Sequence, residues 1–159
     1  MNSPLIRRAL AGPSAVVLIT TLLSALNFAF ASTVQLGNVD FKAGHPVGGE
    51  SLAEATSYTQ EVLSQVLETN ARALKEVPQL GAEIAGFSDS HECAGRECNE
   101  LSLRRASQVY EWLIEHGVPA SKLRGPVADG NKFPLDEGES EEARQLNRRV
   151  QFNLFRIDK

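Results

Sequence analysis

Segments with helical spacing of apolar residues alternate in this chain with segments of strand-like spacing, and this alternation limits the folds open to it. Residues 50–76 contain no glycine or proline and carry a stripe of apolar side chains at helical spacing. Residues 99–115 repeat that pattern, whereas residues 148–157 alternate as a half-buried strand does. Helices that alternate with strands favour an α/β layer sandwich joined by right-handed crossovers.

Two helices are expected, the first ending before Pro78 and the second ending with Gly117 as its C-terminal cap. The residues predicted to face the core are Leu52, Ala55, Thr59, Val62, Leu63, Val66, Leu67 and Leu74 in the first helix, and Ala106, Val109, Tyr110, Leu113 and Ile114 in the second. Strands are predicted at 34–44, 80–87, 123–130 and 148–157. The residues of the last strand expected to share one face are Val150, Phe152 and Leu154. The acidic segment 131–145 is expected to be a loop that closes with one helical turn.

The start of the chain has the order of segments that marks a secretory signal peptide. A basic start at Arg7 and Arg8 precedes an apolar run from Ala15 and the small-residue pattern Ala29-Phe30-Ala31. Residues 1–31 are therefore expected to be a signal peptide, with an uncleaved anchor as the alternative. One domain, residues 32–159, remains. No cysteine stands near the cleavage site, so a lipid anchor on an N-terminal cysteine is not expected.

The charge of the remaining domain limits its partners. The whole chain has 16 Lys and Arg residues, and cleavage would remove two of them, which leaves 14 against 20 Asp and Glu residues, a net charge of −6. This excess of acid makes nucleic acid and anionic membrane surfaces poor partners. A soluble domain outside the cytoplasm, with no membrane span once the signal is removed, is expected.

Cys93 and Cys98 are the only cysteines of the chain. In an oxidising compartment so close a pair is expected to form a disulfide that fixes the shape of a loop. Zinc held by His91 and both cysteines is the alternative, but structural zinc takes four ligands and no fourth soft ligand stands nearby. No metal or other cofactor is therefore expected.

The sequence offers little support for catalysis. None of the three histidines falls in a Ser- or Cys-based nucleophile motif. Asp89, Glu92, Glu97 and Glu100 could supply the two carboxylates of a glycosidase, yet four acids in a polar loop are more often a solvated surface. We therefore expect a binding protein rather than an enzyme.

Asp89 and Arg105 offer opposite charges at one edge of the predicted sheet. Asp89 follows the strand 80–87, and Arg105 lies within the first two turns of the helix that begins near Asn99. A helix N-terminus adds backbone N–H groups and partial positive charge. Such a pocket suits a zwitterion, with its ammonium on Asp89 and its carboxylate on the planar fork of Arg105. The alternative is an internal salt bridge between the two side chains.

The segment GFSDSHECAGRECNELSLRRASQVYEWLIEHGVPASKL, residues 86–123, resembles the signature of OmpA-like C-terminal domains. That signature reads G-x-T-D, a loop, then N-x-x-L-S-x-x-R-A-x-x-V-x-x-x-L and G-[VI]. The residues that carry the resemblance are Gly86, Asp89, Asn99, Leu101, Ser102, Arg105, Ala106, Val109, Leu113, Gly117 and Val118. The later segment LNRRVQF, residues 146–152, is similar to the closing N-R-R-V strand of the family. The resemblance covers about residues 34–156.

The resemblance implies a βαβαβ-type mixed sheet with helices packed on one face. It also implies non-covalent binding of peptidoglycan through the diaminopimelate of its stem peptide, in the periplasm beside the cell wall or outer membrane. The family's aspartate and second arginine hold the ammonium and the carboxylate of diaminopimelate, and these roles fall on Asp89 and Arg105. The other residues implied at the ligand are Asn99, Ser88 and Leu101, with Arg148 in support.

The chain departs from the family pattern around the same pocket. Ser88 replaces the usual threonine but keeps a hydroxyl, and the loop between Asp89 and Asn99 is enlarged and carries both cysteines. The ligand contacts of that loop therefore cannot be carried over. Docking of another envelope protein, with Asp89 and Arg105 as an internal pair, is the alternative function. If the site binds a ligand, Asp89→Ala or Arg105→Ala is expected to abolish binding without unfolding the domain.

Overall fold

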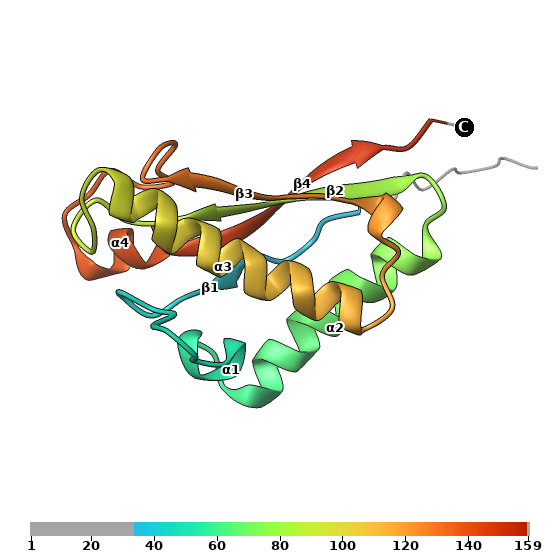
Figure 1. Cartoon of the computed structure of the whole chain (residues 1–159), viewed down its shortest axis with the longest axis horizontal. Coiled ribbons are helices and arrows are strands. Elements are labelled where there is room, and N and C mark those ends of the chain that lie inside the picture. Colours follow the sequence, from blue (N-terminus) through green and yellow to red (C-terminus); the bar gives the residue numbers. More distant parts are fainter. Residues whose placement is uncertain (1–33, 159) are drawn as a thin grey trace, which may run out of the picture. The chain divides into compact units, whose positions relative to one another are not determined.

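A computed structural model describes residues 34–158 (Figure 1), and the signal peptide predicted at residues 1–31 lies outside them. A four-stranded sheet holds its strands in the order β1 (Val39–Asp40), β4 (Arg149–Arg156), β2 (Leu80–Phe87) and β3 (Leu123–Gly130). β4 runs antiparallel to both β1 and β2, whereas β2 and β3 run parallel to each other. The expected mixed sheet is thereby confirmed.

Two long helices, α2 (Gln60–Glu76) and α3 (Arg96–Glu115), cover the same face of this sheet, as expected (Figure 1). The shorter helices are α1 (Leu52–Ala55), the 3₁₀ turn η1 (Ala120–Lys122) and α4 (Glu141–Asn147). The core lies between helices and sheet, and its largest buried members include Val39, Phe41, Leu67, Leu74, Ile84, Val109, Leu113 and Val150. Burial of each such side chain contributes about 1.5–3 kcal/mol, so this layer dominates the stability of the fold. No helix within residues 34–158 has both the length and the apolar composition needed to cross a bilayer.

The prediction of a single helix over residues 50–76 is wrong, because the chain leaves the helical path between α1 and α2. Thr56 is completely buried and pairs with Phe41 as an isolated β-bridge. Thr59, predicted to face the core, is exposed and caps α2, with its hydroxyl accepting a hydrogen bond from the Val62 N–H at 3.4 Å. The pairing of Thr56 with Phe41 ends the helical path, and the cap at Thr59 starts the next helix.

Most residues predicted to face the core do so, and those buried in the long helices are Leu63, Leu67, Leu74, Ala106, Val109 and Leu113. Val62 and Ile114 are 42% and 37% exposed, because each lies at the margin of its apolar stripe. Leu154, predicted to share a buried face with Val150 and Phe152, is 41% exposed because it borders an open hollow near the end of β4.

β1 contains two residues rather than the predicted 34–44. The side-chain amide of Asn70, on α2, accepts a hydrogen bond from the Gly37 N–H at 3.0 Å and donates one to the Gly37 carbonyl at 2.8 Å. The segment before β1 is therefore held by a helix instead of a neighbouring strand. Beyond β1 the chain turns through Gly44 at φ +74°, a conformation that favours glycine.

The loop between β2 and α3, helix α4 and the start of β4 meet at one end of the sheet (Figure 1). α4 confirms the helical turn predicted at the end of the acidic segment. Gly86, near the end of β2, lets α3 lie directly on the strand, since a Cβ there would collide with the Ser102 carbonyl. This close approach brings α3 to the same end of the sheet as Asp89 and Arg148.

Candidate functional site

Asp89 lies in the loop that leads from β2 to α3 and is only 2% exposed. Its Oδ1 accepts hydrogen bonds from the backbone N–H groups of His91 and Glu92 at 2.7 and 3.2 Å, which fixes the first turn of the loop. Its Oδ2 accepts a hydrogen bond of 3.0 Å from Nη1 of Arg148. A carboxylate offers about four lone-pair sites, so one site on Oδ2 has no donor among residues 34–158.

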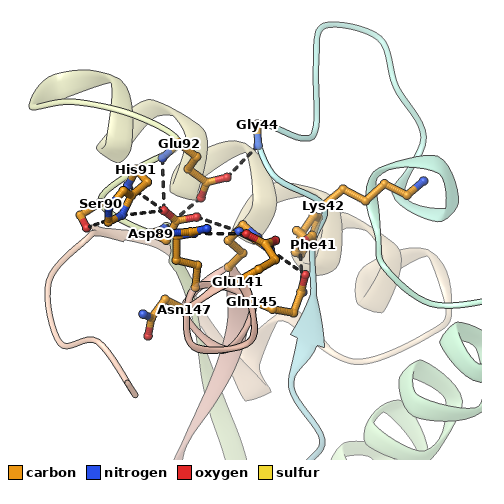
Figure 2. Close-up of polar contacts among 12 residues, drawn as sticks. Phe41, Lys42, Gly44, Asp89, Ser90, His91, Glu92, Glu141, Gln145 and Asn147 are labelled. Atoms are coloured by element: carbon orange, nitrogen blue, oxygen red, sulfur yellow. Dashed lines mark hydrogen bonds and ion pairs between the residues drawn. The ribbon is translucent and has the colours of Figure 1, made fainter. Parts of the chain in front are cut away.

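Arg148 directly precedes β4 and is the salt-bridge partner of Asp89. Its Nη2 donates to Glu141 and, at 2.8 Å, to Gln145, both on α4 and both labelled near Asp89 in Figure 2. Burial acts to lower the pKa of Arg148, but the hydrogen bonds to Glu141 and Asp89 outweigh it and raise the pKa above its ordinary value. Its Nε has no hydrogen-bond partner in the described part of the chain. Arg148 therefore stays charged and keeps unused donor capacity.

Asn147, the last residue of α4, holds the acidic loop beside Asp89. Its Oδ1 accepts hydrogen bonds from the N–H groups of Leu135 and Asp136 at 2.7 and 3.3 Å. Its Nδ2 donates to the Asp136 carbonyl at 2.7 Å. The sequence predicts no role for Asn147, although it opens the N-R-R-V motif that signals the closing strand.

Arg105, on α3, is completely buried and uses its donors inside the protein. Its Nε donates to the His45 carbonyl at 2.8 Å, and its Nη1 and Nη2 donate to the carbonyls of Phe87 and Lys42 at 2.9 and 3.0 Å. The same two nitrogens bind the Glu92 carboxylate in bidentate fashion, at 2.6 and 2.8 Å. Every N–H group of the guanidinium is thereby used, and none is left for a ligand in this arrangement.

The carboxylate of Glu92 is the functional group that the sequence does not single out. Besides the arginine fork, it accepts hydrogen bonds from the N–H of Asp89 at 3.0 Å and of Gly44 at 2.7 Å. Figure 2 shows the side chain between these two residues. Two of its donor residues, Gly44 and Arg105, lie 48 and 13 residues away in the sequence. No local pattern therefore distinguishes Glu92 from the other acids of its loop.

The internal salt bridge between Asp89 and Arg105, which was the alternative to a zwitterion pocket, is wrong. Asp89 pairs with Arg148 and Arg105 pairs with Glu92, so within residues 34–158 the two predicted residues do not pair with each other. The physical reason is the loop after Asp89, which brings the Glu92 carboxylate onto the arginine fork. Opposite charges do gather at this end of the sheet, but in two pairs instead of one.

Two cavities open beside Asp89. The Ser88 cavity has a volume of about 210 Å³, and its lining includes Ser88, Asp89, Asp136, Glu137 and Arg144. The Arg148 cavity has a volume of about 280 Å³, and its lining includes Asp89, Glu92, Glu141, Arg144 and Arg148. Ser88 is 2% exposed, and its hydroxyl has no hydrogen-bond partner among the described residues. Buried hydroxyl groups are normally hydrogen-bonded, and a ligand in this cavity would provide the hydrogen-bond partner that Ser88 lacks.

Neither Asn99 nor Leu101 lines either cavity. Asn99 is exposed on α3, and its side-chain oxygen lies against Gly130 at the end of β3. Leu101 is only 3% exposed and belongs to the buried side of α3. The helix begins at Arg96 rather than near Asn99. Asn99 therefore lies about one helical turn beyond the end of the loop that carries Asp89. Contact of either residue with a ligand stays a prediction.

The structure contains the predicted disulfide between Cys93 and Cys98, whose Cα atoms are 5.1 Å apart. It ties the loop after Glu92 to the first turn of α3. Closing so short a loop contributes on the order of 2 kcal/mol by restricting the unfolded chain. Because both sulfur atoms are in the disulfide, the zinc alternative loses its thiolate ligands.

Protonation of Glu141 is expected to weaken the domain in acid. Hydrogen bonds from Arg148 and Arg144 hold the pKa of Glu141 below its ordinary value of 4.5. The ionised carboxylate therefore stabilises the folded protein fully above about pH 4.5, and this stabilisation is lost as the pH falls through the lower folded-state pKa. Thermal melts of wild type and Glu141→Gln should differ near neutral pH and converge in strong acid. A difference that does not change with pH would contradict this assignment.

The region of the chain that contains the site matches a known protein family. The model of the OmpA family matches residues 57–148, a range that contains Asp89, Arg105 and Arg148. The Escherichia coli (strain K12) protein named "Probable lipoprotein YiaD" is 35% identical over 85 residues, which cover 53% of this chain and 37% of that protein. The chain thus spans well under half the length of this curated relative.

Solved structures show the same fold. The peptidoglycan-associated lipoprotein from Burkholderia pseudomallei superimposes with a TM-score of 0.60 at 24% identity, over 74% of this chain and 89% of that one. The C-terminal domain of Helicobacter pylori MotB gives a TM-score of 0.61 at 22% identity, over 79% of this chain and 89% of that one. The family match extends over more than half of the sequence, and with this shared architecture it settles the relationship: the chain belongs to the OmpA family.

Proposed function

We propose that this domain binds peptidoglycan non-covalently by gripping the diaminopimelate of the stem peptide, and that it catalyses no reaction. Membership of the OmpA family supports the proposal, as does the likeness to a peptidoglycan-associated lipoprotein. The observation that carries it is Asp89, a buried carboxylate that borders both cavities. One lone-pair site on its Oδ2 has no donor within residues 34–158 and is available to a cation.

The ammonium of diaminopimelate is assigned to the Ser88 cavity. Around that cavity, Asp89, Asp136 and Glu137 outweigh the positive charge of Arg144. An excess of negative charge favours an ammonium over other groups. The Ser88 hydroxyl, which lacks a partner in the described chain, can accept a hydrogen bond from one N–H group of the ammonium. We therefore place the ammonium between Asp89 and Ser88.

The carboxylate of diaminopimelate is assigned to Arg105, the role that the family motif implies. A guanidinium fork binds a carboxylate through two parallel hydrogen bonds, and Arg105 already holds Glu92 in that way. Arg148, with its Nε unused in residues 34–158, supports the same end of the ligand. Asp89 accepts a hydrogen bond from Arg148, so the anionic and cationic sides of the site adjoin.

The compartment follows from the same proposal. Residues 1–31 would direct export and leave domain 32–159 in the periplasm, associated with the cell wall or outer membrane. The disulfide between Cys93 and Cys98 fits an oxidising compartment of this kind.

Co-sedimentation with purified, protein-free murein tests the proposal. Wild type should pellet with murein, and Asp89→Asn should bind at least about tenfold more weakly, because an amide cannot provide a charged partner for the ammonium. Glu115→Gln, an exposed change at the far end of α3, should bind as wild type does. Wild type that stays in the supernatant would contradict wall binding and favour an envelope protein as partner. Release of soluble muropeptides would instead indicate an enzyme.

A further inference from the structure

We infer that Glu92 is a built-in competitor of the ligand, whose carboxylate occupies the place on Arg105 that the ligand's carboxylate must enter. Binding then requires the Glu92 side chain to leave. The inference rests on the proposed function, since it concerns the same site. By occupying this place, Glu92 lowers the affinity of the site for the ligand.

The place that Glu92 fills is a complete receptor for a carboxylate. Two N–H groups of Arg105 contact it at 2.6 and 2.8 Å, and the backbone N–H groups of Asp89 and Gly44 contact it at 3.0 and 2.7 Å. In Figure 2 the Glu92 carboxylate lies between Gly44 and Asp89. All four donors contact only the carboxylate oxygen atoms of Glu92, so the carboxylate of a ligand would receive the same hydrogen bonds.

The receptor lies next to the position proposed for the ammonium. Glu92 lines the Arg148 cavity together with Asp89, although its side chain is only 3% exposed. The N–H of Asp89 is itself one of the four donors, while its carboxylate is the proposed partner of the ammonium. Because Asp89 lines both cavities, a ligand that carries both charges on one carbon can place its ammonium on the Asp89 carboxylate and its carboxylate on the receptor.

Only the side chain of Glu92 has to move. Its backbone N–H is held by Oδ1 of Asp89 at 3.2 Å, and the next residue, Cys93, is tied to α3 by the disulfide. A displaced Glu92 therefore stays tethered beside the receptor, at an effective concentration of about millimolar or more. The ligand binds only the fraction of molecules whose receptor is vacant, and its apparent affinity is reduced by that fraction.

Calorimetric titration with a stem tripeptide that ends in diaminopimelate tests the inference. Glu92→Gln keeps the shape of the side chain but turns an amide N–H₂ toward the donors, so it should bind the tripeptide about tenfold more tightly than wild type, or better. Glu97→Gln, which makes the same charge change at an exposed position of α3, should bind as wild type does. Thermal melts establish that each variant is folded. Equal or weaker binding by folded Glu92→Gln would overturn the inference.

A second measurement separates this inference from the proposed function. In Glu92→Ala the receptor is vacant, so acetate at about 100 mM should raise its melting temperature by at least about 3 °C relative to equimolar chloride, with no such rise in wild type. If Glu92→Ala is unfolded in dilute buffer, recovery of folded protein by acetate is the equivalent result. This rise without tripeptide binding by any variant would keep the receptor and overturn the proposed function. Absence of the rise would overturn the receptor itself.

Discussion

Replacement of Arg105 by alanine is expected to lower the free energy of unfolding by about 3–5 kcal/mol. The change leaves Glu92 as a nearly buried carboxylate without its cation. It also leaves the carbonyls of His45, Phe87 and Lys42 without the donors that now satisfy them. Since these carbonyls belong to two different segments, the arginine holds both segments to α3. Urea denaturation of the purified protein measures the loss.

Arg104 provides the matched control for this experiment. It is the neighbouring arginine on the same helix and is exposed, with a hydrogen bond of 3.2 Å from Nε to the Pro46 carbonyl. Arg104→Ala should cost no more than about 1 kcal/mol. Similar losses for the two variants would refute the buried role of Arg105. The sequence alone predicts that Arg105→Ala spares the fold, and the burial of the side chain corrects that expectation.

Gly86→Ala is expected to destabilise the domain by about 3 kcal/mol. A Cβ at this position would collide with the backbone carbonyl of Ser102 and would lie 3.2 Å from Cβ of Ala106. Backbone atoms of a packed helix cannot rotate aside as the end of a flexible side chain can, so α3 would have to move off β2. Because Arg105 belongs to the same helix, the shift should also disturb its pairing with Glu92.

Gly48 serves as the control for the glycine substitution. A Cβ at Gly48 meets no atom within 4 Å, and its backbone does not require a positive φ. Gly48→Ala should be neutral, or stabilising by about 1 kcal/mol at most, through its effect on the unfolded chain. Urea denaturation midpoints that fall equally for Gly86→Ala and Gly48→Ala would argue against the close helix–strand contact.

The parts of the fold that were predictable are those with a strong local pattern. The bounds of β2 and β3 agree with the predicted strands, since short apolar segments between turn residues mark strand limits well. The break between α1 and α2 was missed because it depends on the pairing of Thr56 with Phe41, a contact that periodicity does not encode. Helical spacing reports which face of a segment is apolar, but not which distant residue it meets.

In the candidate site, too, the residues with a local pattern were predictable and the long-range contacts were not. Asp89 and Arg105 were identified because one follows a strand and the other was expected in the first two turns of a helix, and both belong to a family motif. Their partners were not predictable, since Arg148 lies 59 residues from Asp89 in the sequence. The donors to Glu92 likewise include Gly44, which is 48 residues away. Tertiary packing, rather than local composition, decides which carboxylate meets which arginine.

The most direct test of diaminopimelate binding is a calorimetric comparison of two stem tripeptides with the wild-type protein. One ends in diaminopimelate, and the other ends in lysine, which keeps the ammonium but lacks the carboxylate assigned to Arg105. We predict that the diaminopimelate peptide binds at least about tenfold more tightly, because its carboxylate can replace Glu92 on Arg105, whereas the lysine peptide gains only the ammonium contact with Asp89. Equal affinity for the two peptides, or no heat with either, would contradict it.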